Sequence, residues 1–227
     1  VVSSFLIGIS HSAVFSLIAV YATSMNFSIL EVSIVTFLFA ISGAISQWPI
    51  GKLSDVLDRR IVIIYTTFGA ALFCFLAIIS SGQMYMPAGL ATSKIFFYIC
   101  IMCFSFCSLP MFALIFAHTN DFIPKEKFVA AGAGLQFVFG LGAICGPFMC
   151  SLFMEFLGEN GFFIFLIIFH SFIGLFGIYR MQIRESGDNP DSQFAPMPQT
   201  ITPAGIELNP STEPIDEPNN LNEFKKI

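Results

Sequence analysis

The chain has 227 residues, of which 56% are hydrophobic, 15% aromatic and only 11% charged. Because soluble domains carry about 25% charged residues, this composition excludes an ordinary water-soluble fold. The formal net charge of −5 lies entirely after residue 180, since residues 1–180 hold seven basic and seven acidic residues. A neutral, Phe-rich stretch of this length also lacks the clustered Lys and Arg that nucleic-acid binding requires.

Polar punctuation divides residues 1–181 into six apolar runs. Each is long enough to cross the ~30 Å hydrocarbon layer as a helix of roughly 20 residues. The runs are 1–22, 30–50, 61–80, 95–117, 128–157 and 161–180. Backbone groups in lipid must bond within their own segment or within a closed barrel, and these runs are too long and uninterrupted for barrel strands. The sequence therefore predicts an all-α, polytopic membrane protein with six transmembrane helices.

Basic residues between the runs indicate the orientation, because they gather on the cytoplasmic side of membrane proteins. If the six helices alternate in direction, nine of the ten basic residues fall on one side and Lys94 alone falls on the other. The nine are Lys52, Arg59, Arg60, Lys125, Lys127, Arg180, Arg184, Lys225 and Lys226. The loops after the second and fourth helices and the carboxy terminus are then cytoplasmic.

Residues 182–227 differ in composition from the rest, with seven of the twelve prolines, eight of the 15 acidic residues and two of the 29 phenylalanines. Such a segment cannot bury enough apolar surface to offset the entropy of ordering it. We predict a disordered, acidic, Pro-rich cytoplasmic tail, which is a solvated terminus or, alternatively, a binding segment for partners.

Small and polar residues follow one face of the second and fifth predicted helices. They are Ser33, Thr36, Ala40, Gly43 and Gln47 on the second helix, and Gly132, Gln136, Gly140, Ala143, Pro147 and Cys150 on the fifth. Small residues let membrane helices pack closely, which is one interpretation of both stripes. A water-lined path is the other, because Gln47 and Gln136 are larger and more polar than close packing requires.

The same two helices hold corresponding places in a three-plus-three division of the chain. Each has a proline near the end of its stripe, Pro49 and Pro147, and paired interrupted helices are typical of transporters built from inverted repeats. Gly142 and Gly146 also form a small-xxx-small pair, which predicts a close approach of another helix.

His11 lies in the middle of the first predicted helix, beside Ser12. Ionisable groups inside a membrane are costly and are functional candidates. Histidine titrates near neutral pH, so His11 and Ser12 are candidates for lining a cavity and for taking up or releasing a proton. The alternative is a neutral His11 bonded to a neighbouring helix. For His170, in the sixth predicted helix, packing is the better interpretation.

The cysteines and the short motifs give no sign of catalysis. Cys100, Cys103 and Cys107 share a helix face, but no histidine or carboxylate lies beside them, so we expect no metal site. The sequence has no H-E-x-x-H, no G-x-S-x-G and no Gly-rich loop ending in Lys-Ser or Lys-Thr. We therefore expect no enzyme activity and no cofactor.

The most specific run joins the second and third predicted helices on the basic side: Gly51, Lys52, Leu53, Ser54, Asp55, Val56, Leu57, Asp58, Arg59 and Arg60. It resembles the signature G-x-x-x-D-x-x-G-R-[RK] of the major facilitator superfamily, with Asp58 in place of the usual glycine. Gly51 would allow a tight exit from the helix, and Arg59 and Arg60 would form a positive pair at the lipid headgroups. Residues 109–121 and 140–147 add to the likeness, which is strongest to the YcaD-like branch of bacterial permeases.

The resemblance covers roughly residues 1–181 and implies the carboxy-terminal half of a twelve-helix secondary transporter in a bacterial inner membrane. Such a protein moves a small solute by alternating access, and the first, second, fourth and fifth helices of each half line a central cavity. Its partners would be membrane lipid, the amino-terminal six-helix half and a small-molecule substrate. Val1 begins within an apolar run, so we expect the chain to be a fragment of a longer protein.

By the same resemblance, Asp55 would cap a helix amino terminus of the opposite half in the outward-open state, where it meets about +0.5 of a charge. The candidate site has two parts. The first is a conformational-switch loop of Gly51, Asp55, Asp58, Arg59 and Arg60, and the second is a set of cavity-lining residues, His11, Ser12, Ser33, Thr36, Gln47 and Gln136. The alternative function is a non-transporting six-helix scaffold or sensor whose tail binds cytosolic partners.

Overall fold

The structure, a computed structural model, describes residues 1–83 and 90–183 together with Phe194 and Pro196. These residues are almost entirely helical, and no strand occurs among them. Within the described part of the chain, six helical segments are long and apolar enough to cross a membrane. They are Val2–Ser24, Ile29–Val56, Arg59–Ser81, Lys94–Asn120, Lys125–Leu157 and Asn160–Ile183. The all-α fold class with six long apolar segments is confirmed.

The individual helices are α1 (Val2–Ser24), α2 (Ile29–Val56), α3 (Arg59–Gln83), α4 (Leu90–Ser108), α5 (Met111–Asn120), the short 3-10 helix η1 (Lys125–Lys127), α6 (Phe128–Leu157) and α7 (Asn160–Ile183). The fifth and sixth predicted helices are thus α6 and α7. The tail predicted at 182–227 lies outside the described residues, apart from the end of α7, Phe194 and Pro196.

The predicted fourth helix is interrupted, so that α4 and α5 are separate helices within one span. The break falls at Leu109 and Pro110, because proline has no N–H for the helix ladder and its ring clashes with the preceding turn. Pro110 instead starts α5, whose Leu114 N–H bonds to the Pro110 carbonyl at 3.0 Å. Pro49 and Pro147, by contrast, lie inside the continuous helices α2 and α6.

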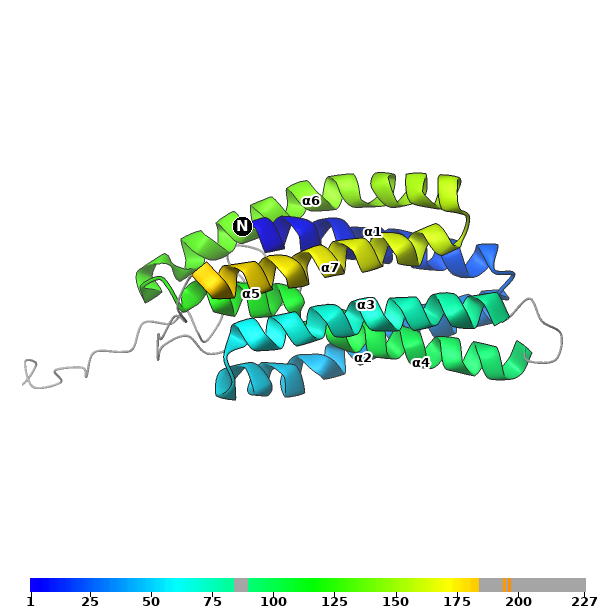
Figure 1. The fold of residues 1–227 in the computed structure, drawn as a ribbon, viewed down its shortest axis with the longest axis horizontal. Helices are drawn as coiled ribbons and strands as arrows, with labels where there is room; N and C mark the ends of the chain where they lie inside the picture. Colours follow the sequence, from blue (N-terminus) through cyan, green and yellow to red (C-terminus); the bar gives the residue numbers. More distant parts are fainter. Residues whose placement is uncertain (84–89, 184–193, 195, 197–227) are drawn as a thin grey trace, which may run out of the picture.

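The packing of the helices follows the three-plus-three division (Figure 1). The segment α1, α2, α3 corresponds to the segment α4/α5, α6, α7. In this correspondence α1 maps onto α4/α5, α2 onto α6, and α3 onto α7. The contact of α1 with α6 therefore corresponds to the contact of α4 with α2. The contact of α3 with α4 corresponds to the contact of α7 with α1. The contact of α3 with α7 maps onto itself, whereas that of α6 with α7 has a smaller counterpart in that of α2 with α3. This exchange pattern is that of an internal repeat, although no repeat of residues is visible in the sequence.

Glycines bring α1 and α6 into backbone contact, as the small-xxx-small pair predicts. A Cβ atom on Gly142 would lie 2.2 Å from the Phe5 carbonyl oxygen, and one on Gly146 would lie 2.2 Å from the Ile9 carbonyl oxygen. On α1, a Cβ atom on Gly8 would lie 2.2 Å from the carbonyl oxygen of Phe139 on α6. Since no side chain fits at these positions, close packing is confirmed as the role of this pair.

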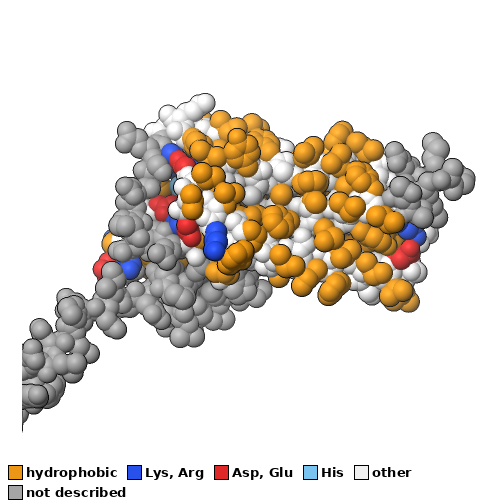
Figure 2. Space-filling model, turned by 90° about the horizontal axis from the view of Figure 1, so that it is seen from below, with side chains coloured by type: hydrophobic (Ala, Val, Ile, Leu, Met, Phe, Trp, Pro, Cys, Tyr) orange, Lys and Arg blue, Asp and Glu red, His pale blue; other side chains and the backbone are white. Residues whose placement is uncertain are grey.

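The surface of the bundle has an apolar middle and charged ends (Figure 2). At one end, Lys94 pairs with Glu31 at 2.5 Å, and Ser28 and Glu31 form a capping box at the start of α2. At the other end lie the basic residues of the motif. The least covered helices are α2 and α6, with 28% and 22% of their most apolar windows buried, against 44–67% elsewhere. A bundle of this shape fits a membrane, with α2 and α6 facing lipid or another helical unit.

Candidate functional site

The motif run is mostly helical rather than a loop. Gly51 to Val56 form the last turns of α2, and only Leu57 and Asp58 separate that helix from α3. The prediction that Gly51 lets the chain leave the helix is therefore wrong. Gly51 instead leaves room for a neighbouring ring, since a Cβ atom there would lie 2.2 Å from Cδ1 of Phe194.

Arg59 is the centre of a charged network that joins three helices. Its side chain is only 8% exposed. One guanidinium nitrogen, Nη2, donates to Asp55 Oδ1 of α2 at 2.7 Å. The other, Nη1, donates to Asp121 Oδ1 and to the Ala117 carbonyl at 3.1 Å, both at the carboxy-terminal end of α5.

This position is electrostatically favourable, because the end of α5 carries the partial negative charge of its unpaired carbonyls. Hydrogen bonds between ionised groups are also roughly twice as strong as neutral ones. The expectation that Arg59 lies at the lipid headgroups is wrong: Arg59 is directed inward, and it fastens the α2–α3 junction to α5.

Asp58 and Arg60 form a second, local pair. Asp58 accepts the Arg60 backbone N–H at 2.9 Å and pairs with the Arg60 guanidinium at 2.5 Å. The hydrogen bond from Arg60 holds the pKa of Asp58 below its ordinary value. Asp58 thus caps the first turn of α3, which explains how an aspartate serves where the superfamily usually has glycine.

The predicted cavity-lining residues are spread over three helices. Ser33, Thr36 and Gln47 lie along α2, Gln136 lies on α6, and His11 and Ser12 lie on α1. Ser33 is exposed, whereas Ser12, Thr36, Gln47 and Gln136 are half-buried. Their role as a cavity lining stays a prediction.

His11 lies inside the bundle, at 1% exposure, against the break between α4 and α5. Its Nε2 is 3.1 Å from both the hydroxyl and the carbonyl oxygen of Ser108, the last residue of α4. The Ser108 hydroxyl also lies 2.8 Å from Nε2 of His170, whose Nδ1 is 3.3 Å from the Ser10 hydroxyl. This matches the alternative of a histidine bonded to a neighbouring helix.

Nothing in the sequence around Ser108 marks it as the serine that joins the two histidines. Ser108 is 97 residues from His11 and 62 residues from His170, so no local pattern indicates the contact. The only available hint was the proline two positions later, which marks a place where the helix ladder is broken and carbonyls become available.

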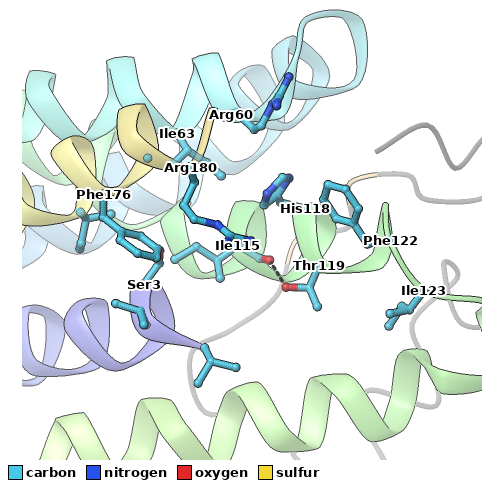
Figure 3. A pocket seen from close by; sticks show the side chains of 14 residues that line it. Ser3, Arg60, Ile63, Ile115, His118, Thr119, Phe122, Ile123, Phe176 and Arg180 are labelled. Carbon is cyan, nitrogen blue, oxygen red and sulfur yellow. Dashed lines mark hydrogen bonds between the residues drawn. The ribbon is translucent and has the colours of Figure 1, made fainter. Parts of the chain in front are cut away.

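A cavity of about 520 Å³ opens at the basic end, between α1, α3, α5 and α7. Its lining includes Ser3, Arg60, His118, Thr119, Phe176 and Arg180. Figure 3 shows Arg180 extending from α7 towards the last turn of α5, where Thr119 bonds to the Ile115 carbonyl at 2.8 Å. None of the predicted cavity-lining residues belongs to this lining.

The described cysteines are all free, and Cys74, Cys100 and Cys150 are buried. Among the described residues, no group of three or more His, Cys, Asp or Glu side chains is placed to hold a metal ion. Cys100, Cys103 and Cys107 lie along α4, which packs on α3 and α2. Cys100 belongs to the buried core and Cys107 packs against it, which fits the interpretation as small packing residues.

The fold and the charged network define a helical, multi-pass membrane protein. The profile of the Major Facilitator Superfamily matches residues 1–215, and the chain belongs to that superfamily. Its members are transporters, and the relatives found by sequence carry the same designation.

Two relatives illustrate the similarity. An uncharacterized MFS-type transporter of Yersinia enterocolitica is 24% identical over 188 residues, which cover 83% of this chain and 44% of the relative. The uncharacterized MFS-type transporter YfkF of Bacillus subtilis is 27% identical over 154 residues, which cover 66% of this chain and 35% of the relative. The chain thus matches less than half the length of these relatives. No solved structure gives a significant match.

Proposed function

We propose that the chain is the carboxy-terminal half of a secondary transporter of the YcaD-like branch, which moves a small solute by alternating access. The observation that carries the proposal is the Arg59 network, in which the superfamily motif fastens α2 and α3 to the end of α5. Two observations support a missing amino-terminal half. The chain matches only 44% of a relative's length, and α2 and α6 are the least buried of the six long helices.

In this mechanism Asp55 belongs to a switch. Its side chain is 36% exposed and pairs on one side with Arg59, so the carboxylate is held at the surface of the bundle. When the two halves close at the cytoplasmic end, Asp55 meets a helix amino terminus of the other half, whose partial positive charge it stabilises. When that end opens, the contact with the other half is lost, while Arg59 keeps Asp55 and Asp121 in place.

The membrane would be a bacterial inner membrane, with the basic end and the tail on the cytoplasmic side. The excess of basic residues at the end formed by the α2–α3 junction and η1 supports this orientation. The central cavity would be lined by α1, α2, α4/α5 and α6. Ser33, Thr36 and Gln47 on α2, Gln136 on α6, and His11 and Ser12 on α1 are its candidate residues.

His11 is the candidate for proton coupling or substrate contact. Its bonds to Ser108 place it where α4 ends, and a cavity that opens beside this break would bring it to water. Thiol labelling of a His11→Cys variant of the complete protein tests the position. Protection of that thiol in every conformation would contradict a cavity role.

The test of transport compares cells that overproduce the complete protein with cells that carry its variants. Mass spectrometry of the medium measures which small solutes accumulate or disappear with the wild-type protein. We expect Asp55→Asn to reach normal abundance in the membrane and to reduce that change. The matched control is Glu126→Gln, which removes an exposed acid at the same end, outside the network. Equal solute changes with wild type and Asp55→Asn would contradict the switch, and no solute change at all would contradict transport.

A further inference from the structure

Phe194 lies against the superfamily motif, although it comes from the tail, more than 130 residues later in the chain. Its backbone N–H donates to Asp55 Oδ1 at 2.9 Å. This is the oxygen that also accepts from Arg59. A backbone donor to a carboxylate is a charge-assisted hydrogen bond, so the contact is among the stronger kinds.

The ring of Phe194 fills a seat on the side of α2. That seat exists because residue 51 has no side chain, since a Cβ atom on Gly51 would lie 2.2 Å from Cδ1 and 2.4 Å from Cε1 of the ring. A glycine inside a helix is less favourable than an alanine. Gly51 lies inside α2 and does not end it. The role that the structure shows for this glycine is to permit the close approach of the Phe194 ring.

The same ring packs on two buried clusters to which α5 and α6 contribute. It contacts the buried cluster of Ala113, Phe116 and Leu135, and also a second cluster that includes Ile50 and Met111. Three helices therefore form the seat, and the Asp55 carboxylate lies at its rim. Phe194 therefore binds both parts of the seat: its ring packs on the apolar clusters, and its N–H donates to the Asp55 carboxylate.

The composition of the tail makes this residue distinctive. Residues 182–227 contain only two of the 29 phenylalanines of the chain, Phe194 and Phe224. In a segment rich in proline and acidic residues, a large aromatic side chain buries more apolar area on binding than the smaller apolar residues around it.

We propose that the cytoplasmic ends of α2, α5 and α6 form a docking seat for the carboxy-terminal tail, with Phe194 as the anchor. The docked tail occupies Asp55 through its backbone N–H. The docking is independent of the transport cycle, whereas its consequence rests on the proposed function: a docked Phe194 competes with the amino-terminal half for Asp55 and so restrains the closing of the cytoplasmic end.

Photo-crosslinking in the membrane-embedded complete protein tests the docking. The probe is p-benzoylphenylalanine in place of Phe194, which keeps both the aromatic ring and the N–H, and the same probe in place of Phe224 is the comparison. We expect the probe at 194 to crosslink to peptides around residue 51, residues 113–116 or residue 135. Crosslinks to the bundle no more frequent than those from position 224, or crosslinks mainly to other proteins, would overturn the proposal.

Closing the seat provides the second arm of the experiment. Gly51→Val places a side chain where the ring lies, and we expect it to lower the crosslink yield from position 194 roughly tenfold. The matched control is Gly134→Val, because a Cβ atom on Gly134 has no neighbour within 4 Å. An unchanged yield with Gly51→Val would contradict the seat.

A measurement without substitutions in the bundle separates docking from a change in α2 itself. Phe194→Ala should speed hydrogen–deuterium exchange at the end of α2, residues 50–56, whereas Phe224→Ala should leave it unchanged. Equal exchange in both variants would also overturn the proposal. Neither readout requires transport, so a failure of the proposed function leaves them interpretable.

Discussion

The contact of α1 with α6 allows a sharp test, because two glycines on one helix differ only in what they face. A Cβ atom on Gly142 would lie 2.2 Å from the Phe5 carbonyl oxygen and 3.0 Å from the Ile9 nitrogen. A Cβ atom on Gly140, two residues earlier, meets nothing within 4 Å. Since ordinary contact begins near 3.4 Å, Gly142→Ala must push the two backbones apart by about 1 Å.

Overpacking of this kind costs about 1–3 kcal/mol of folding free energy. Both variants gain the same helix propensity, up to ~1 kcal/mol, when alanine replaces glycine. That gain cancels in the comparison, so Gly142→Ala should be less stable than Gly140→Ala by about 1–3 kcal/mol.

The assay is thermal unfolding of the purified complete protein, followed with a thiol-reactive dye that reports exposure of the buried Cys74 and Cys150. We expect the unfolding midpoint of Gly142→Ala to fall several degrees below that of Gly140→Ala. Gly146→Ala, whose Cβ atom would lie 2.2 Å from the Ile9 carbonyl oxygen, should behave like Gly142→Ala. Equal midpoints for Gly140→Ala and Gly142→Ala would refute the reasoning about backbone contact.

Three further predictions concern the polar groups. Arg59→Met breaks the largely buried pair of Arg59 with Asp121 and should cost about 3–5 kcal/mol, whereas Arg60→Met should cost about 1 kcal/mol or less, because its pair with Asp58 is local and more exposed. Similar losses in thermal stability for both variants would contradict the network. Ser108→Ala removes the hydroxyl shared by the two buried histidines and should lower thermal stability by about 1–3 kcal/mol, a loss that Ser108→Thr should partly avoid. The pKa of Asp58 is lowered in the folded protein, so its contribution is complete above its unfolded pKa of about 3.9 and is lost as the pH falls through the lower, folded value. The stability gap between wild type and Asp58→Asn, measured by thermal unfolding across pH, should therefore be full at neutral pH and close below about pH 4; a constant gap would argue against the cap.

The spans were predictable from the sequence because hydropathy acts over some twenty residues at a time, and six such runs are hard to confuse with anything else. What could not be predicted depends on contacts between distant residues. Pro49, Pro110 and Pro147 look alike in sequence, yet only Pro110 interrupts its helix. Gly140 and Gly142 also look alike, yet only Gly142 touches α1.

The same limit applies to the candidate site. Arg59 and Arg60 are neighbours of one type, and nothing in their local sequence separates a buried arginine from one that pairs with the aspartate capping its own helix. The structure separates them, because the first turn of α3 directs Arg59 towards Asp121 and leaves Arg60 beside Asp58. His11 was identified as a candidate because it is ionisable within an apolar run, whereas its partner Ser108 has no such mark.

Alternating access is tested most directly by two positions on α2: Thr36, towards the proposed outer end, and Gln47, towards the basic end that we propose to be cytoplasmic. The complete protein carries Thr36→Cys or Gln47→Cys in a background without the native cysteines, and thiol labelling is measured from each side of the membrane. Weakening the cytoplasmic closure with Asp55→Asn should slow the labelling of residue 36 from outside and speed the labelling of residue 47 from the cytoplasm. Changes in the same direction at both positions, or no change at either, would contradict a transporter that opens to one side at a time.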